Sequence, residues 1–288
     1  MAHTLEQLAR QEQTLVSIHG IVRTMKTLAA INAAPYEQAA TAIDGFRQTV
    51  RHGLAAFAWR MGNQVLTDSG AMQRQVLVVF GSDHGFCGNY NAVVARAAQH
   101  FLDAPGAQPG VVLCVGARLH DALADAGVPA DQLLVPPASV DGIGRLAGDI
   151  VTRVEQLGRG APLTRLAVQL AYTRRAGHAE REPHVATLLP LQRALLAPPR
   201  RWPGRSLPDF GMAPAALLAA LLRHHVFASV FHAAAEALVT ENAARLALMQ
   251  QAEQSVEERL ETVRRELSGV RQEQITEELM DIVIGHMQ

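Results

Sequence analysis

The chain has 288 residues, a formal net charge of −1 and a hydrophobic content of 49%. This balance gives no basic field that would attract nucleic acid, and the apolar content excludes general disorder. Two cysteines are too few for a disulfide scaffold or a four-ligand zinc site, which favours a reducing compartment. The first residues predict no secretory signal. Because charged residue Arg223 and two histidines interrupt the most apolar stretch, 213–235, we expect a soluble chain.

A long amphipathic helix is predicted for residues 1–60. Its apolar residues recur in steps of three and four, which is the heptad-like stripe of a helix that packs on a partner helix. The stripe consists of Leu5, Leu8, Leu15, Ile18, Val22, Met25 and Ala29. Because Pro35 lacks a backbone donor and clashes with the preceding turn, we expect a kink near residues 31–35.

The middle of the chain, residues 75–195, changes its period. Short apolar runs alternate here with helical stretches, which predicts a central Rossmann-like α/β domain of about five mostly parallel strands. The runs lie at 76–80, 111–115, 133–135, 166–171 and 185–190. Proline and arginine crowd the following segment, 196–213, which we expect to be an exposed connecting loop.

A second long helix is predicted for residues 214–288, because no proline follows Pro214. If it is helical from Pro214 to Gly285, at ~1.5 Å per residue it would be ~108 Å long, and longer than the first helix. Both helices attach to the same central domain, so their apolar stripes can cover each other only as an antiparallel coiled coil. The C-terminal helix should then project beyond its partner.

The projecting tip is apolar on nearly all sides. Its apolar residues are Ile275, Leu279, Met280, Ile282, Val283 and Ile284. A bare helix with such a surface is unfavourable in water unless another protein encloses it. The sequence therefore predicts an enclosing partner at this tip.

Four passages resemble the gamma subunit of rotary F-type ATP synthases. Residues 21–30 (IVRTMKTLAA) are similar to I-T-x-A-M-x-M-V-A-A, and residues 80–91 (FGSDHGFCGNYN) contain a turn similar to S-D-R-G-L-C-G-x-x-N. Residues 240–249 (TENAARLALM) resemble S-E-x-A-A-R-M-x-A-M, and residues 271–279 (RQEQITEEL) resemble R-Q-x-x-I-T-x-E-L. Lys26 is the only lysine, and His84 replaces the arginine of the turn, which indicates a divergent branch of this family.

The resemblance implies a central rotor shaft that couples ion flow through the membrane sector to ATP synthesis or hydrolysis. Its implied partners are the alpha and beta subunits, the epsilon subunit and the membrane c-ring, with no nucleic acid. The implied location is peripheral, on the cytoplasmic face of the bacterial inner membrane. A subunit of this kind performs no bond chemistry, so no catalytic residue, cofactor or metal is expected.

The same resemblance implies which residues meet the partners. Met25 and Arg245 match positions that face the moving lever segments of the beta subunits, and Lys26 lies beside Met25 in the same passage. Arginine suits such a place because its planar fork pairs carboxylates bidentately. Three further residues match positions near the upper bearing formed by the alpha and beta subunits: Gln272, Thr276 and Glu278.

Two rival functions remain at this point. One is an independent α/β enzyme whose turn at 81–91 binds a phosphate ligand. A Walker A site is excluded because the only lysine lies elsewhere, and the glycine spacing fails G-x-G-x-x-G. In the same turn Cys87 and His84 lack a third orienting group, which favours a buried structural thiol over a nucleophile. The second rival is a generic coiled-coil adaptor, which leaves the ordered family passages unexplained.

Two other features have ordinary explanations. His224, His225 and His232 lack the spacing of metal ligands, so we expect solvated or interface histidines. The segment 172–205 has seven arginines against two glutamates, which predicts an exposed hairpin and loop. A sharper hypothesis is that part of this segment faces the membrane ring or anionic headgroups.

Overall fold

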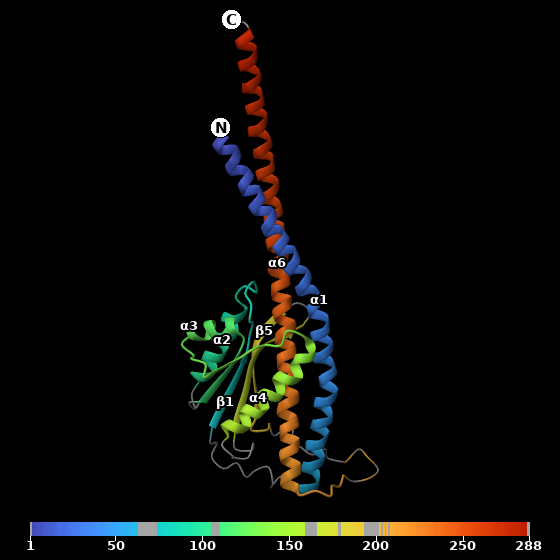
Figure 1. Ribbon diagram of the computed structural model, residues 1–288. Helices are drawn as coiled ribbons and strands as arrows, with labels where there is room; N and C mark the ends of the chain where they lie inside the picture. Colours follow the sequence, from blue (N-terminus) through green and yellow to red (C-terminus); the bar gives the residue numbers. More distant parts are fainter. Residues whose placement is uncertain are drawn as a thin grey trace. The chain divides into compact units, whose positions relative to one another are not determined.

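The computed structural model describes residues 2–62, 74–104, 110–158, 166–177, 180–192, 202, 204, 206 and 208–286. Its elements in chain order (Figure 1) are α1 (Ala2–Met61), β1 (Arg74–Phe80), α2 (Tyr90–Leu102), β2 (Gly110–Val115), α3 (Ala117–Asp125), β3 (Gln132–Leu134), η2 (Val140–Gly142), α4 (Ile143–Leu157), β4 (Leu166–Ala176), β5 (Glu180–Leu189) and α6 (Pro214–His286). Half of the predicted loop 196–213 lies outside the described residues.

The chain divides into two compact units, Met1–Ile31 with Arg245–Gln288, and Asn32–Ala244. Each long helix therefore contributes to both units. Because the division falls inside the two helices, the predicted ends of the helices could not indicate it. Helix α1 continues through Pro35 without a break in its helical backbone. The kink near residues 31–35 stays a prediction.

The unit Asn32–Ala244 is built on one five-stranded sheet in the order β3-β2-β1-β4-β5. The first four strands are parallel, and β5 pairs antiparallel with β4. This confirms the predicted α/β class. Strand β1 is buried at six consecutive residues because helices cover both faces of the sheet, which explains its continuous apolar run.

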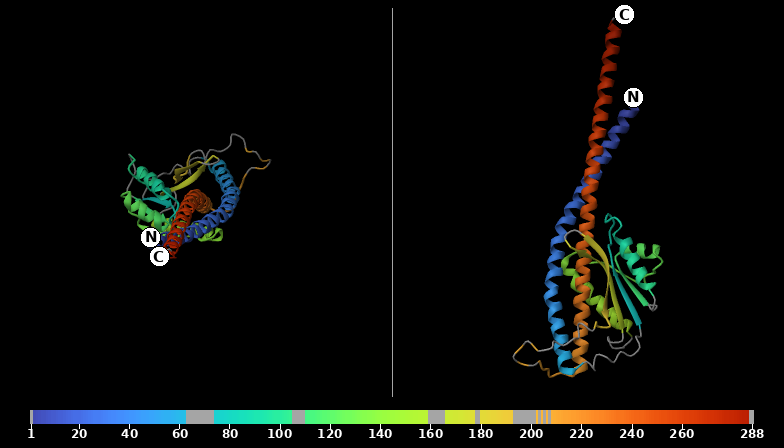
Figure 2. Two further views of the ribbon diagram at one scale, coloured as in Figure 1. Left: turned by 90° about the horizontal axis from the view of Figure 1, so that it is seen from above. Right: turned by 180° about the vertical axis from the view of Figure 1, so that it is seen from behind.

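Successive residues of β1 point to opposite faces of the sheet and enter different cores. Val76, Val78 and Phe80 pack with α4 and with the parts of α1 and α6 that belong to this unit. Leu77 and Val79 pack with α2 and α3 on the other face. Figure 2 shows the same two layers around the sheet. The long helices are thus core elements of this unit.

Helix α6 is anchored to the sheet by buried polar contacts as well as by packing. The Tyr90 hydroxyl of α2 donates to the carbonyl of Ala237 over 2.8 Å, and burial raises the pKa of this phenol. Thr240 donates within α6 and lies 3.1 Å from the carbonyl of Thr173 in β4. By length and composition α6 could cross a membrane, but Val226 and other residues of this part are buried in the core.

The β4–β5 hairpin is longer than the sequence predicts, since its strands continue to Ala176 and begin again at Glu180. The added residues include charged ones, which is why the sequence did not predict that the strands continue through them. In the fold these charges are paired. Arg174 pairs with Glu182 across the hairpin, and Arg175 pairs with carboxylates of the long helices. These arginines are occupied within the chain, which weakens the headgroup hypothesis for the hairpin. Four of the seven arginines of segment 172–205 lie outside the described residues.

His225 corrects the expectation of a solvated or interface histidine, because it is 8% exposed. Burial is the main cause that lowers its pKa to about 4, and the positive charges of Arg47 and Arg51 act in the same direction. Its Nε2 atom has no hydrogen-bond partner within the described part of the chain. The neutral imidazole therefore belongs to the core.

A buried neutral histidine makes folding sensitive to acid. Between its ordinary pKa near 6.5 and the folded value near 4, the unfolded chain binds the additional proton. Stability should therefore fall as the pH drops, by ~2 kcal/mol between pH 7 and pH 5 from this residue. Urea unfolding of the native chain and of His225→Leu at both pH values measures it. We expect the variant to lose about this much of the pH dependence, whereas His224→Leu, at an exposed position, should keep it. An unchanged dependence in His225→Leu would contradict the assignment.

Candidate partner interface

The unit Met1–Ile31 with Arg245–Gln288 is an antiparallel helix pair. Among the described residues, three polar contacts join the helices, and their positions rise along α1 as they fall along α6. These contacts are Glu12 with Arg264, His19 with Glu257, and Lys26 with Glu253. The end of α6 extends past the first turns of α1 (Figure 1), as the difference in helix length predicted. The coiled coil of the predicted fold class is confirmed.

The face of α1 that is covered by α6 has two sets of residues spaced by seven. One set is apolar and contains Leu8, Leu15, Val22 and Ala29. The other set is polar and contains Glu12, His19 and Lys26, each paired across the helices. The predicted stripe is therefore wrong at Ile18, which is 40% exposed because His19 occupies the covered position. Pairing with carboxylates makes a polar residue acceptable at that place.

The tip of α6 is uncovered. Leu267 is the last buried residue of α6 among the side chains that the structure describes. The six apolar residues of the tip, from Ile275 to Ile284, are each between 53% and 60% exposed. The prediction of an apolar tip that the chain itself does not cover is confirmed.

The three predicted bearing residues all lie beyond Leu267 on the uncovered part of α6 and are exposed. The Thr276 hydroxyl donates to the carbonyl of Gln272 over 2.8 Å, so it is satisfied within its own helix. Glu278 accepts from Gln274 over 3.1 Å, also along α6. Exposure leaves these side chains accessible, and their contact with partner subunits stays a prediction.

The structure separates Lys26 from the two predicted lever-facing residues, Met25 and Arg245. Lys26 forms an ion pair with Glu253, and this hydrogen bond is the main cause that lowers the pKa of the Glu253 carboxyl. The charge of Lys26 is therefore used inside the coiled coil. Met25 and Arg245 are half-buried on α1 and α6. Contact of these two side chains with the beta subunits stays a prediction.

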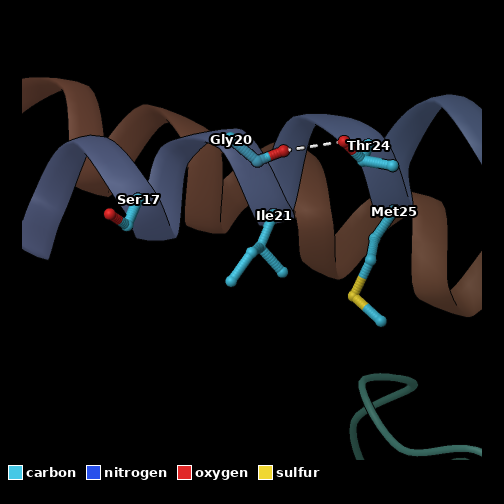
Figure 3. A pocket seen from close by; sticks show the side chains of 5 residues that line it. All are labelled: Ser17, Gly20, Ile21, Thr24 and Met25. Carbon is cyan, nitrogen blue, oxygen red and sulfur yellow. Dashed lines mark hydrogen bonds between the residues drawn. The ribbon is translucent and has the colours of Figure 1, made fainter.

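A second apolar face of α1 was missed by the sequence analysis. Ile21, Leu28 and Ile31 are 53% to 62% exposed, although they are as apolar as the covered stripe. Beside Ile21 lies a shallow hollow of about 470 Å³, which Figure 3 shows. It is lined by Ser17, Gly20, Ile21, Thr24 and Met25. Ile21 and Leu28 are seven residues apart, which places them on one face of the helix and could have indicated this second face. The sequence was interpreted with a single apolar stripe.

The glycine turn at 81–91 packs closely against the start of α3. A Cβ at Gly81 would lie 2.5 Å from Leu119, so only glycine fits between the strand and α3. The Asp83 carboxylate and the Ser82 carbonyl already accept the first N–H groups of α3. Asn91 accepts from the Ser82 N–H over 2.9 Å. The Ser82 N–H and the first N–H groups of α3 are therefore occupied within the chain and are not free for a phosphate, which disfavours the phosphate-binding alternative.

Cys87 is buried in this turn, and its Sγ lies 3.4 Å from the Ser82 hydroxyl. The contact that His84 makes with it comes from the backbone carbonyl, at 3.9 Å, while His84 itself is exposed. The geometry supports the structural thiol and offers no imidazole base to activate it.

Comparison with known proteins agrees with these features. The family model described as ATP synthase matches residues 4–287. The chain belongs to the ATP synthase family. Two relatives named ATP synthase gamma chain match it over 98% of both chains: that of Anaeromyxobacter sp. (strain Fw109-5) at 27% identity, and that of Beijerinckia indica subsp. indica at 25%.

Solved structures with the same fold come from this family as well. A chain of the Euglena gracilis mitochondrial ATP synthase rotor superposes with a TM-score of 0.64 at 17% identity, covering 96% of this chain and all of that one. A second Euglena gracilis structure, of OSCP, F1 and c-ring, gives a TM-score of 0.63 at 16% identity, with 98% and 93% covered. At these identities the structures support the fold, and family membership rests on the sequence match.

Proposed function

We propose that this ATP synthase family member is the central rotor shaft of an F-type ATP synthase. The observation that carries the proposal is the exposed apolar tip of α6, which requires a collar of other chains. The alpha and beta subunits would supply this collar, and the epsilon subunit and membrane c-ring would hold the opposite part of the shaft. Rotation then couples ion flow to ATP synthesis or hydrolysis.

The mechanism follows from asymmetry. A two-helix shaft inside a ring of three alpha and three beta subunits presents a different face to each beta subunit. Each beta subunit is thereby biased toward a different conformation. As the shaft rotates, the populations of these conformations shift in one beta subunit after another. The exposed second face of α1, with Ile21, Leu28 and Ile31, gives the shaft an apolar bearing surface in addition to Met25.

The polar interface residues are part of the same proposal. Arg245 would pair with carboxylates of the beta levers, and Gln272, Thr276 and Glu278 would contact the upper bearing. Lys26 would act on partners mainly by fixing Glu253 and the helix pair, because its ammonium is already paired. The chain would perform no bond chemistry itself. Its location would be peripheral, at the cytoplasmic face of a bacterial inner membrane.

Purification of the tagged full-length chain from its native membranes tests the proposal. We expect alpha, beta, epsilon and c subunits to co-purify, and the preparation to hydrolyse ATP. Removal of the membrane sector should leave the chain with the alpha and beta subunits. Recovery of the chain as a soluble monomer, with no nucleotide-hydrolysing partner, would contradict the proposed function.

A further inference from the structure

Three potential metal ligands meet between the two helices of the coiled coil. The donor atoms of His19 on α1 and of Glu253 and Glu257 on α6 lie within 4.8 Å of one another. The two glutamates are one helical turn apart and share a face, and His19 reaches them from the opposite helix. The family resemblance assigns no function to this cluster.

The distances suit a small divalent cation. His19 Nε2 lies 3.1 Å from Glu257 Oε1. Two ligand atoms that each lie ~2.0–2.1 Å from a tetrahedral metal ion are ~3.3 Å from each other. The distance between His19 Nε2 and Glu257 Oε1 is therefore already close to the distance expected when both bind the same ion. Glu257 is exposed and can rotate to complete the shell, and solvent can supply a fourth ligand.

We propose that His19, Glu253 and Glu257 bind a divalent cation of the zinc class, which ties α1 to α6. One imidazole with two carboxylates suits Zn²⁺, whereas Mg²⁺ and Ca²⁺ prefer shells made of oxygen. A bridge of this kind joins the two helices at one level of the coiled coil. It would limit sliding of one helix along the other.

Lys26 competes with the cation for this site. Its ammonium is paired with Glu253. An incoming metal ion must therefore displace the lysine or tolerate its charge. Removing the ammonium and removing the imidazole should change metal affinity in opposite directions.

Calorimetric titration of Zn²⁺ into the full-length chain at pH 7 tests the site. We expect His19→Ala to weaken the tightest binding step by about tenfold or more. Lys26→Met should strengthen it by about fivefold or more, because a positive charge near the metal is removed. His52→Ala is the matched control, since His52 is an exposed histidine of the same helix outside the cluster. It should bind as the native chain does.

Helix content measured by circular dichroism confirms that each variant is folded before it is titrated. Unchanged affinity in His19→Ala would overturn the proposal, and so would unchanged or weakened affinity in Lys26→Met. An equal loss in His52→Ala would show unspecific histidine binding and overturn it too. Displacement of Zn²⁺ by equimolar Mg²⁺ or Ca²⁺ would contradict the assigned class of cation.

Discussion

Replacing Ile282, Val283 and Ile284 with serine should weaken assembly of the chain with the alpha and beta subunits by about 100-fold. Each side chain is more than half exposed in the isolated chain, so enclosure by a collar would bury the remaining surface. That burial is worth ~1 kcal/mol for each residue, or ~3 kcal/mol together, which corresponds to about two orders of magnitude in affinity. Titration of labelled chain with purified alpha and beta subunits measures the change.

The same substitutions should leave the fold of the chain intact. The tip contributes no buried side chain among the residues that the structure describes, so the midpoint of thermal unfolding should move by less than a few degrees. Val135→Ser is the matched control, because Val135 is 74% exposed but lies beside the sheet instead of on the tip. Equal affinities of the triple variant and the control would show that the tip is not enclosed.

Replacing Arg175 with methionine should destabilise the unit Asn32–Ala244 by about 3–5 kcal/mol. Arg175 contacts both carboxylate oxygens of Glu236, at 2.6 Å and 3.3 Å, and also pairs with Glu37 on α1. The Glu236 side chain is 8% exposed. Without Arg175, the Glu236 carboxylate would be a buried charge with little access to water. The hydrogen bond with Glu236 is also the main cause that raises the pKa of Arg175.

A double-mutant cycle separates this effect from lost packing. Glu236→Leu alone should cost ~1 kcal/mol, because Arg175 keeps Glu37 and is partly solvated. The double variant, Arg175→Met with Glu236→Leu, should recover most of the loss, since it buries no unpaired charge. Glu37→Gln, at the exposed end of the network, should cost at most ~1 kcal/mol. Urea unfolding gives all four values. Additive losses in the double variant would contradict the buried pair.

The overall architecture was predictable because its signals are strong and local. Apolar runs such as 76–80 mark strands buried on both faces, and the residues after Pro214 contain no proline that would end a helix. The tip was predictable for the same reason. An apolar surface on all sides of a helix has no partner within a chain whose other long helix is shorter.

What the sequence concealed depends on pairing between distant residues. His19 takes the covered position expected for Ile18 because Glu257 lies opposite it on α6. The residues next to His19 in the sequence do not indicate that this glutamate is its partner. The extended β4–β5 hairpin was hidden for a related reason, since Arg175 is satisfied by Glu236, 61 positions away. His225 became a core residue through packing that its polar neighbours in the sequence do not indicate.

Labelling of a single introduced cysteine tests the enclosed tip most directly. The two native cysteines are buried, and burial raises the pKa of Cys114 to about 12, so neither competes for a thiol reagent. With Leu279→Cys, we expect rapid maleimide labelling of the isolated chain. In the purified complex labelling should be slower by about tenfold or more, while Val135→Cys labels at a similar rate in both. Equal rates at position 279 in the isolated chain and in the complex would contradict the account of α6 as a shaft held in a collar.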